Sequence, residues 1–150
     1  MGSFEPVSLV KCDSYEYSHV RKALEKSLSL VDAFSFVKSG MKVGIKTNLV
    51  TGIAPEKAVT THPVVLKCLC EMLTERGATV VIGDSPGGLY TAAFVKGIYK
   101  ACGLLELESN SVKLNDDFSV KEAEFNDAVS IKTFSYTGWL DGCDAIIMIA

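Results

Sequence analysis

Two short polar segments follow predicted buried strands and carry the residues best suited to chemistry. The first is Lys46-Thr47-Asn48, and the second is Asp84-Ser85-Pro86-Gly87-Gly88. A lysine ammonium can bind an anionic ligand oxygen, and an asparagine amide can orient it. An aspartate at a strand end suits a hydroxyl or a Mg²⁺-type cation. Glycines between a strand and a helix let backbone N–H groups approach an anion.

Each segment also has a purely structural interpretation. Lys46 and Asn48 suit a surface lysine and a turn, and Asp84 or Ser85 suits a turn cap. Lys46 and Asp84 can also form an ion pair between neighbouring strands. The glycine segment matches neither G-x-G-x-x-G nor G-x-x-x-x-G-K-[ST], so its spacing assigns no nucleotide. The structural and the ligand-binding interpretations both stay open on the sequence alone.

A third candidate is His62, in the run Thr60-Thr61-His62-Pro63. A histidine beside a predicted helix start favours a cap over a catalyst, and we keep it as a candidate only because it falls on the same edge. No catalytic residue and no metal ligand is assigned. The candidate ligand-binding residues are Lys46, Asn48, His62, Asp84, Ser85, Gly87 and Gly88.

The elements that must position these residues alternate along the chain. Apolar runs predict strands at 7–11, 41–46, 79–83 and 144–150. Helical periodicity predicts helices that start at Asp13, with Glu16 completing a capping box, at Pro63 and at about Thr91. The segments 121–125 and 129–134 predict a hairpin across Asn126-Asp127.

This alternation predicts a three-layer, doubly wound α/β fold with a mostly parallel, Rossmann-like sheet, as one domain over residues 1–150. Right-handed crossovers place every strand-to-helix loop on one edge, where ligands bind in such sheets. The last predicted strand runs into residue 150. We therefore expect the N-terminal part of a longer protein, truncated at its C-terminus, and an exposed sheet edge that favours self-association.

Composition excludes several classes of function. The 150 residues carry a net charge of −3, which argues against a nucleic-acid surface. We see no signal peptide and no apolar run long enough to span a bilayer, so we expect a cytoplasmic protein without membrane contact. The five cysteines include no C-x-x-C pair, which predicts reduced thiols and no cofactor held by this chain.

Three ordered motifs resemble the domain of unknown function 362 family. They are Val43-Gly44-Ile45-Lys46-Thr47-Asn48-Leu49-Val50, Thr60-Thr61-His62-Pro63, and Val81-Ile82-Gly83-Asp84-Ser85-Pro86-Gly87-Gly88. The segment from Asp141 to Ile149 also resembles a strand of that family. The likeness covers most of the chain. One departure is Thr47, where the family usually has proline, and we expect it to loosen the loop.

The resemblance implies a link to iron–sulfur chemistry, because family members are commonly described as iron–sulfur-cluster-binding proteins. It places the cluster in a C-terminal module outside this chain. We therefore expect a ligand-binding or enzymatic domain, redox-linked in the full-length protein, with an anionic or hydroxylated small molecule at the sheet edge. The alternative is a non-catalytic docking domain that presents an iron–sulfur module to a partner.

The cysteine pattern generates a first prediction. Purified protein should contain no stoichiometric iron, because no four thiolates have the spacing of a cluster site. Metal analysis and a visible absorbance spectrum check this. A brown preparation with iron bound in proportion to protein would contradict it.

Overall fold

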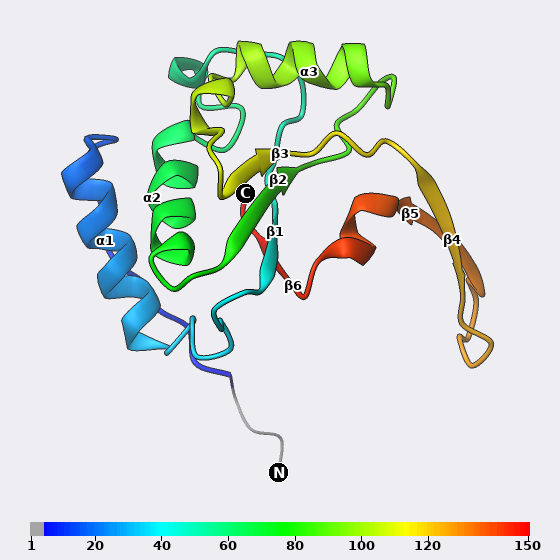
Figure 1. The fold of residues 1–150 in the computed structure, drawn as a ribbon, viewed down its shortest axis with the longest axis horizontal. Coiled ribbons are helices and arrows are strands. Elements are labelled where there is room, and N and C mark those ends of the chain that lie inside the picture. The colour runs from blue at the N-terminus through cyan, green and yellow to red at the C-terminus, as the bar shows by residue number, and fades with distance from the viewer. Residues whose placement is uncertain (1–4) are drawn as a thin grey trace.

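A four-stranded parallel sheet forms the centre of the computed structural model, which describes residues 5–150 (Figure 1). Its strand order is β3-β2-β1-β6. The strands are β1 (Lys42–Lys46), β2 (Thr79–Gly83), β3 (Val112–Leu114) and β6 (Ala145–Met148). The helices are α1 (Tyr17–Leu30), α2 (Pro63–Thr74) and α3 (Ala92–Ala101). The model confirms the predicted Rossmann-like α/β fold with a mostly parallel sheet.

The remaining elements are short. The antiparallel hairpin pairs β4 (Val120–Glu124) with β5 (Thr133–Thr137) and extends away from the sheet (Figure 1). Three 3₁₀ turns are η1 (Pro55–Lys57), η2 (Leu105–Leu107) and η3 (Gly138–Gly142). Because η3 lies between β5 and β6 in the chain, it joins the hairpin to the sheet.

One face of the sheet forms the hydrophobic core with α2 and α3. Alternate strand residues point to this face and are fully or almost fully buried: Val43, Ile45, Val80 and Ile82. They belong to one apolar cluster with residues of α2 such as Leu66 and with residues of α3 such as Val95. Helix α1 then packs on the outside of α2. Burial of both sides of α2 explains why Cys68 and Cys70, two residues apart, are both buried.

The opposite face of the sheet lacks side chains at two central positions, and Trp139 occupies that space. Gly44 and Gly83 lie on neighbouring strands and face the indole ring. A Cβ atom would lie 3.1 Å from the ring at Gly44 and 2.8 Å from it at Gly83. Real Cβ atoms essentially never come as close as 2.8 Å to a neighbour, and at Gly44 a Cβ would also lie 2.9 Å from Cys143 Sγ. Glycine at both positions therefore lets Trp139 of η3 pack directly on the strand backbone.

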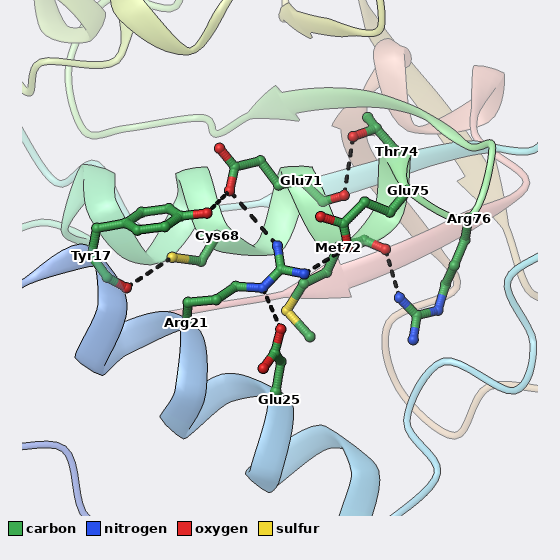
Figure 2. Close-up of polar contacts among 9 residues, drawn as sticks. All are labelled: Tyr17, Arg21, Glu25, Cys68, Glu71, Met72, Thr74, Glu75 and Arg76. Atoms are coloured by element: carbon green, nitrogen blue, oxygen red, sulfur yellow. Dashed lines mark hydrogen bonds and ion pairs between the residues drawn. The ribbon is translucent and has the colours of Figure 1, made fainter.

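A charged cluster joins α1 to α2 (Figure 2). Arg21 donates to Glu25 within α1 and to Glu75 just beyond the end of α2, both at 2.6 Å. The Tyr17 hydroxyl donates to Glu71 at 2.5 Å. The hydrogen bond from Arg21 lowers the pKa of Glu75, and the reciprocal bonds raise the pKa of Arg21. These pairs fix how α1 lies along α2.

Two predictions for the N-terminal segment were wrong. Residues 7–11 form no strand, and Val7 and Leu9 are 92% and 96% exposed. The segment pairs with neither edge strand of the sheet, β3 or β6. The capping box is also absent. Helix α1 begins four residues after Asp13, and Asp13 instead pairs with Lys11 at 2.6 Å.

The second half of the chain differs in detail from the prediction. The sequence did not reveal β3, whose three residues give too short a pattern. The hairpin exists, but the connection between its strands covers residues 125–132 rather than Asn126-Asp127 alone. On β6, Ile146 and Met148 are 47% and 77% exposed, so this edge strand presents apolar side chains. Self-association through such an edge stays a prediction.

The five cysteines are all free thiols, as predicted. Three of them are buried, namely Cys68, Cys70 and Cys102. Burial raises the pKa of the Cys70 thiol to about 12, so it stays protonated and behaves as a core residue. Among residues 5–150, no helix is long and apolar enough to cross a membrane.

The contact between Trp139 and Gly83 generates a prediction about stability. Gly83→Ala should lower the free energy of unfolding by about 1–3 kcal/mol, because the added methyl group collides with a buried ring. Gly97→Ala is the matched control. It adds the same atom on the exposed side of α3 with no neighbour within 4 Å, and should raise stability by about 0.5–1 kcal/mol. Urea denaturation measures both, and equal effects would contradict the packing described here.

The α1–α2 cluster generates a prediction about pH. The lowered pKa of Glu75 means that its pair with Arg21 contributes fully above the ordinary value of 4.5 and is lost as pH falls through the lowered pKa. Arg21→Met should therefore be less stable than wild type at neutral pH, and the gap should narrow in acid. Unfolding at a series of pH values tests this, with Lys22→Met on the exposed side of α1 as control. A gap that does not change with pH would contradict it.

Candidate functional site

Three of the candidate residues, Lys46, Asp84 and Ser85, lie together where β1 and β2 end at the same edge of the sheet. Lys46 is the last residue of β1 and pairs in register with Gly83, the last residue of β2. Asp84 therefore follows directly beside Lys46. On the other side of β1, Lys46 pairs with Met148 of β6. In the order β3-β2-β1-β6 the direction changes between β1 and β6, and open α/β sheets bind ligands at the carboxyl edge near such a point.

Lys46 and Asp84 form an ion pair at this edge. Lys46 Nζ lies 2.9 Å from Asp84 Oδ1, and the two side chains are 35% and 5% exposed. The second carboxylate oxygen, Oδ2, accepts a hydrogen bond of 2.8 Å from the backbone N–H of Leu49. Asp84 thus holds both the end of β1 and the loop that follows it. The ion pair between neighbouring strands, which the sequence analysis left open, is therefore formed. This ion pair does not exclude a ligand.

Lys46, Asp84 and Ser85 line a cleft of about 430 Å³. The other walls come from Tyr90 before α3, from the hairpin and from η3. Sequence reasoning missed the hairpin and η3 residues because they lie far from the ends of β1 and β2 in the chain. The contributing hairpin and η3 residues are Val120, Ser135, Tyr136, Thr137, Trp139 and Leu140. Only the unusual placement of a single tryptophan next to a glycine could have drawn attention to one of them.

Tyr90 is held firmly in the wall of this cleft. Its ring packs edge-on against Phe118, with centroids 5.4 Å apart and planes at 72°. Its hydroxyl accepts a hydrogen bond of 3.4 Å from the Asn115 amide. Burial raises the pKa of Tyr90, although hydrogen bonds with Asn115 and Thr137 oppose this. The phenol is therefore protonated at neutral pH and can donate.

Asn48 takes part in a separate junction behind the ion pair. Its N–H donates to Thr61 Oγ1 at 3.0 Å, and its carbonyl accepts from the Thr61 N–H at the same distance. Thr61 Oγ1 in turn donates to the carbonyl of Ile149, which follows β6. Asn48 therefore links the loop after β1 to the end of β6. It is not among the described residues that line the cleft.

Thr47 does not loosen this loop, contrary to the expectation from the family pattern. Its N–H donates to the Gly83 carbonyl at 3.0 Å, a bond that proline cannot make, and its side chain is fully buried. Nearby, Val50 adopts a φ of 45°, a costly conformation for a β-branched residue. The loop after β1 is thus tied to β2 and locally strained.

His62 is the N-cap of α2. Its Nδ1 accepts a hydrogen bond of 3.2 Å from the Val64 N–H, and its ring stacks on Tyr15 with centroids 3.8 Å apart. Burial lowers the pKa of His62, which keeps Nδ1 free to accept. The cap interpretation favoured by the sequence accounts for these contacts. His62 lies outside the cleft that Lys46 and Asp84 line.

The glycine turn lies outside the cleft that Lys46 lines. Gly87 and Gly88 are exposed and do not line the cleft, whereas Ser85 does. Gly88 has a φ of +106°, and a Cβ there would lie 3.0 Å from the Phe94 ring. The positive φ of Gly88 in the turn before α3 requires a glycine at this position. Within residues 5–150, no group of three His, Cys, Asp or Glu side chains is placed to hold a metal ion.

Most of the chain matches a known protein family. The family described as "Domain of unknown function (DUF362)" matches residues 43–150. The chain belongs to this family. The matched range begins within β1 and contains every candidate residue from Lys46 to Gly88. It thereby confirms the resemblance drawn from the three sequence motifs.

A curated relative adds a second comparison. The chain is 35% identical over 81 residues to a thylakoid-associated protein of Synechocystis sp.. That match covers 53% of this chain and 25% of the relative, so the chain spans about a quarter of the relative's length. No solved structure matches the chain.

The bonds of Asp84 generate a prediction about stability. Asp84→Ala should lower the free energy of unfolding by about 1–3 kcal/mol, because it leaves the buried Leu49 N–H without an acceptor. Asp84→Asn keeps an oxygen acceptor and should cost less. The control is Asp13→Ala, which breaks an exposed pair with Lys11 and should change little. Equal losses in Asp84→Ala and Asp13→Ala would contradict the buried role of Asp84.

Proposed function

We propose that this chain is a ligand-binding or enzymatic α/β domain that holds an anionic or hydroxylated small molecule at the carboxyl edge of its sheet. The observation that carries the proposal is the Lys46–Asp84 pair, which borders a cleft at the carboxyl ends of β1 and β2. Lys46 is the more exposed partner and can donate to a ligand oxygen. Asp84 and Ser85 can accept from or donate to a ligand hydroxyl.

Backbone strain near this edge supports the same proposal. Val50, four residues after Lys46 in the chain, has a φ of 45°, which is costly for a β-branched residue. Strain of this kind clusters at active sites and ligand-binding sites.

In the full-length protein we place this domain beside redox chemistry, with the iron–sulfur cluster in another module and none in this chain. This part of the proposal rests on the resemblance of the sequence motifs, since the matched family is described as one of unknown function. We propose a cytoplasmic location. The relative from Synechocystis is described as thylakoid-associated, so a fluorescent fusion of the full-length protein should be scored for both locations.

The alternative function is a docking domain that presents an iron–sulfur module to a partner. One observation favours it, namely the exposed apolar residues at the tip of the hairpin. The hairpin extends away from the sheet (Figure 1). Val129 is fully exposed, Ile131 is 73% exposed and Phe125 is 59% exposed. Exposed apolar clusters of this kind are typical of interaction surfaces. Ligand binding that depends on Lys46 and Asp84 separates the two functions, because the hairpin tip contains neither residue.

Substitutions at the ion pair test the proposed function. Lys46→Met and Asp84→Asn in the full-length protein should abolish ligand binding or activity while the fold, followed by thermal melting, is retained. Lys11→Met and Asp13→Asn are matched controls, because they remove the same charges from a pair that lies outside the cleft. Full function in both ion-pair variants would refute the proposal and leave Lys46 and Asp84 as structural residues.

A further inference from the structure

The cleft has three aromatic residues in its wall, and each comes from a different part of the chain. Tyr90 precedes α3, Tyr136 lies on β5 and Trp139 lies in η3. Trp139 is 5% exposed and packs on Gly83, and Tyr90 packs on Phe118, so both rings are held in place. Aromatic walls of this kind favour a planar ring over a flexible or globular ligand.

The charges of the cleft disfavour a multiply charged anion. Of the described residues that line it, only Lys46 and Asp84 carry a charge, and they neutralise each other at 2.9 Å. A phosphate beside Lys46 would also lie beside the Asp84 carboxylate, whose repulsion opposes binding. The Gly87-Gly88 amides, which could have offset that repulsion, lie outside the cleft.

The same ion pair suits a hydroxyl group. It presents an ammonium donor and a carboxylate acceptor close together, and a hydroxyl can accept from the first while it donates to the second. A fully ionised phosphate group can only accept. Three aliphatic hydroxyl groups also line the cleft, on Ser85, Ser135 and Thr137. A volume of about 430 Å³ lies within the range of small-molecule sites.

We infer that this cleft takes an uncharged, hydroxylated planar ring, of the phenol or dihydroxybenzene class, and discriminates against phosphate-bearing ligands. The inference rests on the proposed function of the same cleft and selects the hydroxylated class from the two that were proposed. Lys46 and Asp84 bind a ring hydroxyl, and Tyr90, Tyr136 and Trp139 flank the ring.

The chain contains one tryptophan, so its indole N–H gives a single reporter signal in a proton–nitrogen correlation spectrum. We would titrate the full chain separately with resorcinol, with its saturated counterpart cyclohexanediol and with inorganic phosphate. Resorcinol should shift the Trp139 signal saturably. Cyclohexanediol should bind roughly tenfold more weakly, because it keeps the hydroxyls but loses the contacts of a planar ring. Phosphate should cause no saturable shift.

Two variants test which residues are responsible. Tyr136→Ala should weaken resorcinol binding roughly threefold to tenfold, whereas Tyr15→Ala, which removes a tyrosine outside the cleft, should leave it unchanged. Lys46→Met should also weaken it. Absence of a saturable shift with resorcinol, or equal binding of resorcinol and cyclohexanediol, would overturn the inference.

The outcomes separate this inference from the proposed function. Saturable phosphate binding that requires Lys46, without resorcinol binding, would overturn the ring class and support an anion site at the same edge. Resorcinol binding that is lost in Tyr136→Ala but unchanged in both Lys46→Met and Asp84→Asn would overturn the role of the ion pair. That second result would count against the proposed function as well.

Discussion

The bonds of the Asp84 carboxylate are the constraint on which the site depends. One oxygen pairs with Lys46 at the end of β1, and the other accepts from the Leu49 N–H in the following loop. A buried carboxylate is costly unless it is paired and hydrogen-bonded, and these two contacts satisfy it. Because the partners lie on β1 and its loop while Asp84 follows β2, the carboxylate also holds the two strand ends together.

The two faces of the sheet are packed in different ways. One face is apolar and buried under α2 and α3, which gives the domain its core. The other face presents Gly44 and Gly83, and the indole of Trp139 fills the space above them. That arrangement brings η3 and the hairpin to the carboxyl edge, where they become the outer walls of the cleft. Gly44 and Gly83 therefore shape the site although they contribute no side chain to it.

Much of the architecture could be predicted from local pattern. Strands β1 and β2 and helices α2 and α3 are long enough for their periodicity and their glycine or proline boundaries to be recognised. Short elements gave weaker signals. The three residues of β3 were missed, and the apolar run at 7–11 was taken for a strand although Val7 and Leu9 face solvent. An apolar run shows that a segment can form a strand, but whether it pairs depends on contacts with segments far away in the chain.

The sequence by itself determined which residues stand at the strand ends, because Lys46 and Asp84 each follow an apolar run in a parallel α/β pattern. It could not decide how those residues are used. Only the tertiary structure placed Lys46 Nζ 2.9 Å from Asp84, made His62 a helix cap and turned Gly88 toward Phe94. It also brought Tyr136 and Trp139 to the same edge. The physical reason is that strand-end position follows from local periodicity, whereas the walls of a cleft depend on contacts between segments far apart in the chain.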